Sequence, residues 1–247
     1  MAILEERGCA AGYQRMFRSV IDEVQLRPGE AILDVGCGTG VLDRWLARHT
    51  ADANRIVAVD ANGYLLREAK AFARQEGLAE RIAFHEGRAE ALPFPDASFD
   101  VALSVTVLEE GDAERMLAEL PRVARPGGRV AAIVRAVDMP GWINLPLRRD
   151  LKVKAEFPFP GAGVAAGGCA DASLYRRFCA AGLSRVSMWP YLAAFEDGPR
   201  ARIIERGMRT RLAGTELEEW AQAMAHAEAD GTFFVCQPFH CAVGTKR

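Results

Sequence analysis

The sequence contains no apolar run of the roughly 20 residues needed to span a bilayer. Its first residues, MAILEERGCAAGYQRMF, include early acidic side chains and lack the long apolar core of a secretion signal. The formal net charge is only −2 over 247 residues, which gives no overall attraction to nucleic acid or to an anionic membrane. These absences favour a cytoplasmic protein without a membrane or nucleic-acid partner, present as a monomer or homodimer.

Metal-binding patterns are also missing. No C-x-x-C pair occurs among the six cysteines, and the four histidines form no acid–base constellation. We therefore expect free thiols, no metal centre, and a structural role for His240. A thiol-bound metalloid substrate at Cys169, Cys179 and Cys236 is a less favoured alternative.

Apolar residues make up half of the chain, which is enough for one sizeable α/β core over residues 1–247. Apolar runs and periodicity predict strands near 32–35, 55–60, 81–84, 99–105, 128–137, 184–191 and 232–243. Helices are expected near 12–24, 41–49, 63–76, 112–124, 171–181 and 200–225. The alternation of strands and helices through the fifth strand favours a parallel sheet with helical crossovers.

A glycine-rich turn stands out within this pattern. It follows the short apolar strand 31–35 and leads into the amphipathic segment 41–49, with glycines at positions 36, 38 and 40. A dinucleotide site would show G-x-G-x-x-G, and a phosphate-binding P-loop would place Lys after the glycines; this chain has neither feature. The turn therefore indicates a nucleoside ligand without a phosphate chain. Asp60 ends the next strand, where its carboxylate can accept both hydroxyl protons of a ribose.

Four segments in order carry a family resemblance. The sequence LDVGCGTG at 33–40 resembles the first motif of the class I S-adenosylmethionine-dependent methyltransferases, and IVAVD resembles the second. The segments 87–104 and 120–134 are similar to that family's adenine-side loop with its fourth strand, and to its Pro-Gly-Gly turn with its fifth strand. The resemblance implies a doubly wound, Rossmann-like sheet of seven strands, mostly parallel, with an antiparallel last strand beside the fifth. It also implies S-adenosylmethionine as the cofactor.

The same resemblance implies which residues hold the cofactor. Asp34 and the glycine turn correspond to the methionine end, Asp60 to the ribose, and residues 88–90 to the adenine. The aromatic Tyr13 would contact the methionine portion or the substrate, with a core position as the alternative. The full set of expected cofactor-binding residues is Tyr13, Asp34, Gly36, Cys37, Gly38, Gly40, Asp60, Ala61, Arg88, Ala89, Glu90 and Ser104.

One position departs from the family pattern. Arg88 stands where members commonly place Asp, whose carboxylate accepts a hydrogen bond from the adenine amino group. An arginine side chain has only donors. We expect backbone recognition around Ala89 with Glu90 nearby; Arg88 would then stack near the adenine or point to solvent, and a solvated pair of Arg88 and Glu90 is the alternative.

The acceptor side is less strongly defined by the sequence. Glu109 and Glu110 follow the fourth strand, and Glu110 is the preferred general base, although the acids could instead form a charge pair with Asp112 at a helix N-terminus. Trp142, Phe157 and Tyr191 are candidates for an apolar substrate pocket, and ordinary core positions are the alternative. Residues 138–170, with Phe159 and the glycine-rich run 161–168, are predicted to form a substrate lid and its hinge, or otherwise a surface loop.

The predicted function is methyl transfer to a small, aromatic or otherwise apolar metabolite at oxygen, nitrogen or carbon. A catalytically silent module that binds S-adenosylmethionine is the main alternative. A nucleic-acid-modifying methyltransferase is less favoured, because the chain has no strongly basic stripe and no Asn/Asp-Pro-Pro-aromatic motif after the fourth strand.

Overall fold

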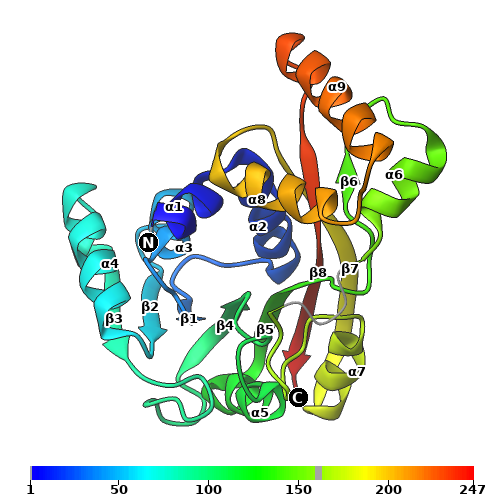
Figure 1. The fold of residues 1–247 in the computed structure, drawn as a ribbon. Coiled ribbons are helices and arrows are strands. Elements are labelled where there is room, and N and C mark those ends of the chain that lie inside the picture. Colours follow the sequence, from blue (N-terminus) through cyan, green and yellow to red (C-terminus); the bar gives the residue numbers. More distant parts are fainter. Residues whose placement is uncertain (1, 159–162) are drawn as a thin grey trace.

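The computed structural model describes residues 2–158 and 163–247, which form one mixed sheet with helices on both faces (Figure 1). The strands are β1 (Ala31–Val35), β2 (Arg55–Asp60), β3 (Ile82–Glu86), β4 (Phe99–Val105), β5 (Ala124–Arg135), β6 (Trp142–Ile143), β7 (Leu183–Phe195) and β8 (Val235–Lys246). Their order is β3-β2-β1-β4-β5-β8-β6, and β7 also pairs with β8. The strands β1 to β5 run parallel to one another, whereas β8 is antiparallel to β5, β6 and β7. The predicted doubly wound sheet with an antiparallel last strand is confirmed.

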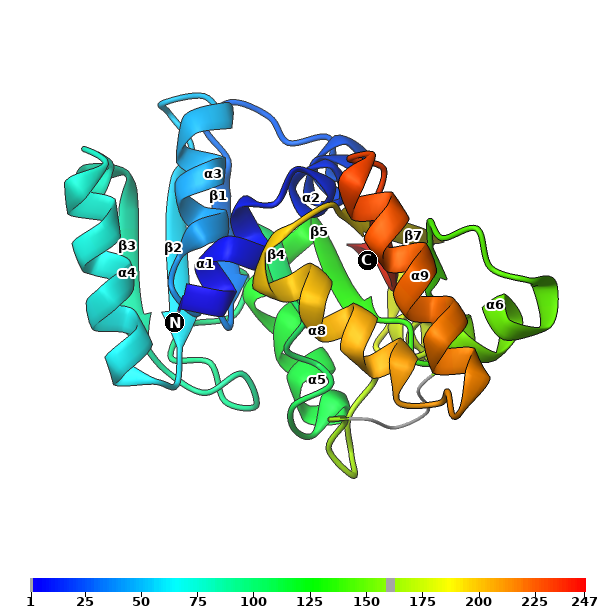
Figure 2. The ribbon, with the colours of Figure 1, turned by 45° about the horizontal axis from the view of Figure 1, so that its top comes forward.

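The helices that surround the sheet fall into two layers (Figure 2). They are α1 (Ala2–Cys9), α2 (Ala11–Val24), α3 (Val41–His49), α4 (Gly63–Gln75), α5 (Ala113–Val123), α6 (Arg149–Glu156), α7 (Ser173–Ala180), α8 (Gly198–Arg209) and α9 (Thr215–Ala229), with a short 3-10 turn at Ala79–Arg81. Within the described ranges, no helix is both long enough and apolar enough to cross a bilayer.

Strand side chains alternate between two cores, as a sheet covered on both faces requires. Ile32 packs in the core that contains α2 and α3, and Leu33 packs in the core that contains α5 and α7. Asp34, two positions after Ile32, therefore lies on the α3 side of the sheet. This alternation places one polar residue of β1 beneath the glycine turn.

Three elements differ from the sequence-based prediction. The helix expected over 200–225 is two helices, α8 and α9, because the chain turns at Gly214, whose φ of +56° favours glycine. The first helix α1 was not predicted, and it packs against α2, α3 and α8. Residues 138–158 contain the short strand β6 and the helix α6, while 159–162, including Phe159, lie outside the described residues.

Candidate active site

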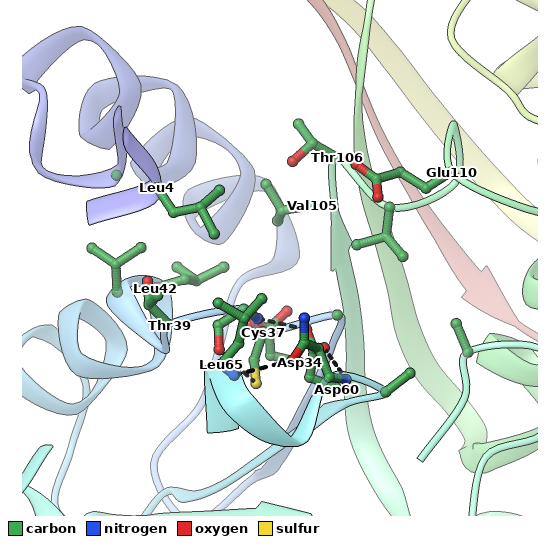
Figure 3. A pocket seen from close by; sticks show the side chains of 18 of the residues that line it. Leu4, Asp34, Cys37, Thr39, Leu42, Asp60, Leu65, Val105, Thr106 and Glu110 are labelled. Atoms are coloured by element: carbon green, nitrogen blue, oxygen red, sulfur yellow. Dashed lines mark hydrogen bonds between the residues drawn. The ribbon is translucent and has the colours of Figure 1, made fainter. Parts of the chain in front are cut away.

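A cavity of about 380 Å³ lies at the carboxyl ends of β1, β2 and β4, where an open α/β sheet binds its ligands. Figure 3 shows Asp34, Cys37 and Asp60 on its floor, Leu4 and Leu42 on one side, and Thr106 and Glu110 on the other. The expected site residues that line it are Tyr13, Asp34, Gly36, Cys37, Gly38, Asp60, Ala61, Arg88, Ala89, Glu90 and Glu110. The structure thus gathers on one cavity most of the residues expected to bind the cofactor.

The first two glycines of the turn shape the cavity wall with main-chain groups. The Gly36 and Cys37 amides donate to the Val59 carbonyl, at 2.7 and 3.1 Å, which ties the turn to β2. Gly36 has φ +79°, and a Cβ there would lie 2.3 Å from Val107 Cγ2. Only glycine fits this position, so the backbone itself borders the space available to a ligand.

Gly40 is a correction to the predicted site. It does not line the cavity; it is the N-cap of α3 at φ +71°. A Cβ at Gly40 would lie 3.0 Å from Phe84 Cε1 and 3.2 Å from Ala69 Cβ. This glycine therefore allows α3 to begin close to α4 and β3, and it contributes packing rather than ligand contact.

Asp60 is fixed in place at the end of β2. One of its carboxylate oxygens accepts the Gly38 amide and the other accepts the Asn62 amide, each at 2.8 Å. A carboxylate has about four lone-pair directions, so both oxygens retain acceptor capacity toward the cavity. A pre-positioned acid of this kind fits a vicinal diol such as that of a ribose.

Asp34 faces a second buried acid, Asp43 of α3. The two carboxyl groups interact, and both side chains are almost completely buried. Burial, together with the nearby charge of Asp60, raises the pKa of Asp34 to about 7, and the interaction with Asp43 opposes that rise. Burial and Asp34 raise the pKa of Asp43 well above its ordinary value. The two acids under the glycine turn therefore retain a proton to higher pH than ordinary carboxyl groups do.

The floor of the cavity fits the methionine end of S-adenosylmethionine. Asp34 Oδ1 is buried without a hydrogen-bond partner among the described residues, and it belongs to a side chain that lines the cavity. A buried orphan acceptor calls for a donor, and a ligand ammonium group can supply one. Asp34, the Gly36 and Gly38 backbone and Asp60 together match the donor and acceptor pattern of that cofactor.

The expected adenine side is formed mainly by a loop backbone. Residues 88–90 line the cavity, but the Arg88 side chain is 74% exposed and lies 3.4 Å from a Glu90 carboxylate oxygen. The Glu90 side chain is only 15% exposed. Arg88 thus points largely to solvent, which leaves the main chain around Ala89 and the Glu90 carboxylate as the available acceptors.

Ser104 is a second correction. It is 1% exposed and does not line the cavity, which begins at the next residue, Val105. Within β4, Ser104 pairs with Val35 of β1 and Ala132 of β5. Its position inside the sheet, one residue before the strand end, keeps it away from the ligand space.

The N-terminal helix α1 adds a wall that sequence reasoning missed. Leu4, Arg7 and Gly8 line the cavity, and a Cβ at Gly8 would lie 2.3 Å from Val41 Cγ1 of α3. Arg7 donates to the Thr106 hydroxyl at 3.2 Å and lies over the Tyr13 ring. In the sequence, Gly8 was the one residue of this segment that could have indicated such close packing of α1 against α3.

Thr106 was also missed. It follows β4, lines the cavity, and has φ +56°, which is rare for a β-branched residue. Its amide donates to the Ile133 carbonyl at 2.7 Å. Tyr13 lies nearby with a buried hydroxyl that has no hydrogen-bond partner among the described residues, and its ring packs edge-on against Phe239. Tyr13 is therefore both a cavity residue and part of the core.

The two adjacent acids after β4 have different environments. Glu110 lines the cavity and is exposed to it, and its amide donates to the Val107 carbonyl. Glu109 is 1% exposed and forms an ion pair with Arg135 of β5 at 3.2 Å. Burial raises the pKa of Glu109, and the Arg135 charge opposes the rise. Only Glu110 of this pair faces the ligand space.

The three aromatic residues expected in a substrate pocket do not line the cavity, and this prediction is wrong for it. Trp142 is 36% exposed and packs against Phe234, while Phe157 is 59% exposed beneath Arg211. Tyr191 lies in β7 opposite Phe239, against the core. They come from separate elements: Trp142 lies in β6 and Tyr191 in β7, whereas Phe157 follows helix α6.

The described part of the predicted lid, residues 138–158 and 163–170, also lies away from the lining of this cavity. No described residue of 138–170 lines it. The glycine-rich run is anchored where the structure describes it: the Ala113 amide donates to the Gly167 carbonyl at 3.0 Å, and the Ala165 amide donates to the Glu109 carbonyl at 2.8 Å. A Cβ at Gly168 would lie 2.6 Å from that same carbonyl oxygen. Gly168 therefore permits tight packing against residue 109, while the start of the run lies outside the described residues.

The remaining candidates from the sequence lie elsewhere. His240 is buried and hydrogen bonds through Nε2 to Asp138 at 2.8 Å, away from the cavity lining. All six cysteines are free thiols, and of them only Cys37 lines the cavity. Burial raises the pKa of Cys37, with the nearby charges of Asp43, Asp34 and Asp60 adding to the effect, so its thiol stays protonated.

Comparisons with known proteins agree with this geometry. Residues 32–128 match the family model described as a methyltransferase domain. The ubiquinone/menaquinone biosynthesis C-methyltransferase UbiE of Hahella chejuensis is 35% identical over 152 residues, which cover 57% of this chain and 61% of that protein. The chain therefore spans less than two thirds of this relative.

Solved structures resemble the fold over a longer stretch. The YcgJ protein of Bacillus subtilis superposes with a TM-score of 0.63 at 19% identity, covering 95% of this chain and 99% of that one. A geranyl diphosphate methyltransferase in complex with S-adenosylmethionine superposes with a TM-score of 0.59 at 15% identity, covering 97% and 92%. At these identities the likeness concerns the fold alone.

Proposed function

We propose that this chain, which carries the methyltransferase domain of the class I S-adenosylmethionine-dependent methyltransferases, transfers a methyl group to a small, apolar or aromatic metabolite at oxygen, nitrogen or carbon. The observation that carries the proposal is the single cavity on which Asp34, the glycine turn, Asp60 and Glu110 converge. The match to the methyltransferase domain model by itself supports cofactor binding but does not identify a catalytic residue. The cavity adds an acid that faces the place where an acceptor would lie.

Cofactor binding is assigned to main-chain groups and fixed acids. Asp34 and the backbone of Gly36 to Gly38 would hold the methionine end, Asp60 the ribose hydroxyls, and the loop at 88–90 the adenine. The bound sulfonium supplies an electrophilic methyl group. What the chain's own residues add is orientation of the acceptor and exclusion of water, and orientation can account for roughly 7–11 kcal/mol of a barrier in favourable cases.

The acceptor side is assigned to the residues opposite the turn. Glu110 would remove a proton where the acceptor is a hydroxyl group, a role that typically contributes about 10²–10⁴-fold to the rate. Leu4, Arg7 and Gly8 of α1 would exclude water from above, a task that the sequence suggested for residues 138–170. Thr106, held by Arg7, would border the approach of the acceptor.

The UbiE relative is named a C-methyltransferase of quinone biosynthesis, which is in keeping with methyl transfer to carbon of an apolar ring compound. The matched domain, residues 32–128, covers the cofactor side. The acceptor side draws on Thr106 and Glu110 within that domain and on α1, which lies outside it, so this chain's acceptor is assigned from its own cavity rather than from that relative.

Calorimetric titration with S-adenosylmethionine and S-adenosylhomocysteine, followed by transfer of a labelled methyl group over a panel of aromatic and aliphatic metabolites, tests the proposal. We expect binding of both nucleosides and a methylated product from at least one acceptor. Binding without any product would favour the silent binding module. If neither nucleoside bound, the cavity would not be the S-adenosylmethionine site that we propose.

A further inference from the structure

A second cavity, of about 250 Å³, lies beside α8, the end of β5 and the start of β8. Val137, Met139, Ile203, Ile204 and Met208 give it an apolar lining, and two arginines, Arg135 and Arg200, are its only charged residues among those the structure describes. Nothing in the methyl-transfer machinery described above uses this space. A mostly apolar cavity with a few convergent polar groups is the usual form of a small-molecule site.

The two arginines differ in their partners. Arg135 pairs with Glu109 at 3.2 Å and donates to the Gly163 carbonyl at 2.6 Å. Arg200 donates from Nε and Nη2 to one oxygen of Gln237, at 3.1 and 2.5 Å. Within residues 2–158 and 163–247, no carboxylate forms an ion pair with the Arg200 side chain. The side-chain hydrogen-bond partner of the Arg200 guanidinium is thus the neutral amide of Gln237, and the charge of Glu6 acts on it without forming an ion pair.

Burial makes this arrangement unfavourable for the cation. Desolvation, together with the nearby charges of Arg7 and Arg135, lowers the pKa of Arg200 to about 10, and the charge of Glu6 opposes this shift. A partly buried guanidinium with an amide as its only side-chain partner gains from an anion, and its planar group suits a carboxylate. The other long cations of α8 lack this character; Arg202, for example, is 50% exposed and pairs with Glu228.

The second cavity also adjoins the active site. Glu6 of α1 accepts the Arg200 amide at 3.1 Å, and the next residue, Arg7, lines the first cavity and holds Thr106. Glu109, which pairs with Arg135 of the second cavity, directly precedes Glu110 of the first. The contacts Glu6–Arg200 and Glu109–Arg135 therefore link residues that line the arginine-lined cavity to the immediate neighbours of Arg7 and Glu110, which line the cofactor cavity.

We propose that the second cavity binds the apolar, carboxylate-bearing part of the methyl acceptor, with Arg200 pairing with its carboxylate. The identification of this ligand as the acceptor rests on the proposed function; the preference of the cavity for an apolar carboxylate does not. Residues 138–158 contribute Met139, Gly141 and Pro158 to its wall. This segment would then cover the acceptor rather than the cofactor.

A matched pair of probes tests the preference directly. We would saturate the protein with S-adenosylhomocysteine and titrate 4-phenylbutanoate and 4-phenylbutanamide, which differ only in the charge and polarity of one end. Calorimetry should show the acid binding at least tenfold tighter than the amide. Equal binding of the two probes, or binding of neither, would overturn the proposal.

Variants locate the effect. Arg200→Gln should abolish the preference for the acid and leave affinity for S-adenosylhomocysteine within twofold, whereas Arg200→Lys should retain part of the preference. Arg202→Gln on the same helix is the matched control and should behave as the wild type. Circular dichroism melting confirms that each variant is folded. A preference for the acid that survives in Arg200→Gln would place the probe elsewhere and sink the assignment.

The two proposals fail in different ways. If the proposed methyl-transfer function is wrong, the protein will bind no nucleoside, or it will bind a nucleoside without forming a methylated product. Loss of the second would appear as intact nucleoside binding with no discrimination between acid and amide. A final comparison, kcat/KM for hydroxyphenyl carboxylates against their amides, should favour the acids by at least tenfold in the wild type and not in Arg200→Gln.

Discussion

In the proposed site, the cofactor side of the first cavity is built from main-chain amides and short acids within residues 34–90. The proposed acceptor side is built from longer side chains: those of α1, Thr106 and Glu110 in the first cavity, and those of β5 and α8 in the second. On the cofactor side, the spacing of two glycines and Asp60 along adjacent strands is sufficient to set the geometry. On the acceptor side, Arg7 reaches Thr106 across 99 positions of the chain. The cofactor side is therefore formed by residues close together in the sequence, whereas the acceptor side is brought together by the tertiary fold. Substitutions on the cofactor side should change nucleoside affinity, and substitutions on the acceptor side should change turnover.

The largest effect is expected at the glycine turn. Gly36→Ala would place a Cβ 2.3 Å from Val107 Cγ2 in a backbone at φ +79°. Overpacking costs about 1–3 kcal/mol and left-handed backbone strain about 1–2 kcal/mol, so we expect a loss of about 2–5 kcal/mol in the free energy of unfolding and no detectable nucleoside binding. Denaturant unfolding and calorimetry measure the two quantities.

Gly29→Ala is the matched control for that substitution. Gly29 has φ +86°, but nothing lies within 4 Å of a Cβ built there. Its substitution should cost only the backbone term of about 1–2 kcal/mol and leave nucleoside affinity unchanged. Equal effects of the two alanines would show that the contact with Val107 does not matter.

The acceptor side should respond in turnover alone. Glu110→Gln removes the proton acceptor that faces the cavity, so we expect kcat to fall about 100-fold for a hydroxyl acceptor, with unchanged affinity for S-adenosylhomocysteine. Steady-state kinetics and calorimetry measure these effects. Glu114→Gln, an exposed acid on α5, should match the wild type. Wild-type turnover in Glu110→Gln would return that residue to a structural role, and a parallel loss of nucleoside affinity would erase the separation of the two sides.

Asp60 should show the opposite pattern. Asp60→Ala leaves ribose hydroxyls and the Gly38 amide without their acceptor, and an unsatisfied group of this kind costs about 1–3 kcal/mol. Nucleoside affinity should fall by about 10- to 100-fold, as measured by calorimetry. Asp52→Ala removes a 95% exposed carboxylate and serves as the control. An unchanged dissociation constant in Asp60→Ala would take this residue out of the site.

The smallest effect is expected in the pH dependence of the free energy of unfolding that arises from Asp34 and Asp43, the two buried acids beneath the glycine turn. The pKa values of Asp34 and Asp43 are raised in the folded protein, so the folded state binds more protons than the unfolded chain at mildly acidic pH. Their contribution to the free energy of unfolding is fully present below the unfolded pKa values and is lost as pH rises through about 7. Asp43→Asn should flatten this dependence and raise stability at pH 8 by about 1–2 kcal/mol.

Thermal or denaturant unfolding from pH 5 to pH 8 measures this dependence. Asp150→Asn, at a carboxylate that is 75% exposed, is the control and should leave the pH profile unaltered. A profile for Asp43→Asn that is as steep as that of the wild type would show that the two buried acids do not retain a proton to higher pH than ordinary carboxyl groups do.

The sequence-based predictions succeeded and failed along the same division. The parallel strands, the glycine turn and Asp60 were placed correctly, because strand ends and glycine spacing are encoded in a few consecutive residues. Gly40 and Ser104 were assigned to the cavity from their motif positions, but helix packing and strand alternation turn them away from it.

The larger errors concern segments whose neighbours are distant in the chain. Trp142, Phe157 and Tyr191 were grouped by chemistry alone, and none of them lines the cofactor cavity. Trp142 and Tyr191 are placed by the pairing of β6 and β7 with β8, and Phe157 lies at the end of α6. The helix α1 carries no strong apolar periodicity, so its position over the cavity could not be foreseen from the sequence.

The sequence by itself determined the glycine turn and the position of Asp60, because the ends of hydrogen-bonded strands and glycines with positive φ allow the backbone few alternative conformations. Only the folded molecule decided three other features: that α1 closes the cavity, that Glu110 rather than Glu109 faces it, and that Arg200 is partly buried without an ion-pair partner. Those choices depend on contacts between residues up to almost two hundred positions apart, such as Glu6 with Arg200. Local propensity has no means of specifying such pairs, because their energies appear only when the whole sheet has formed.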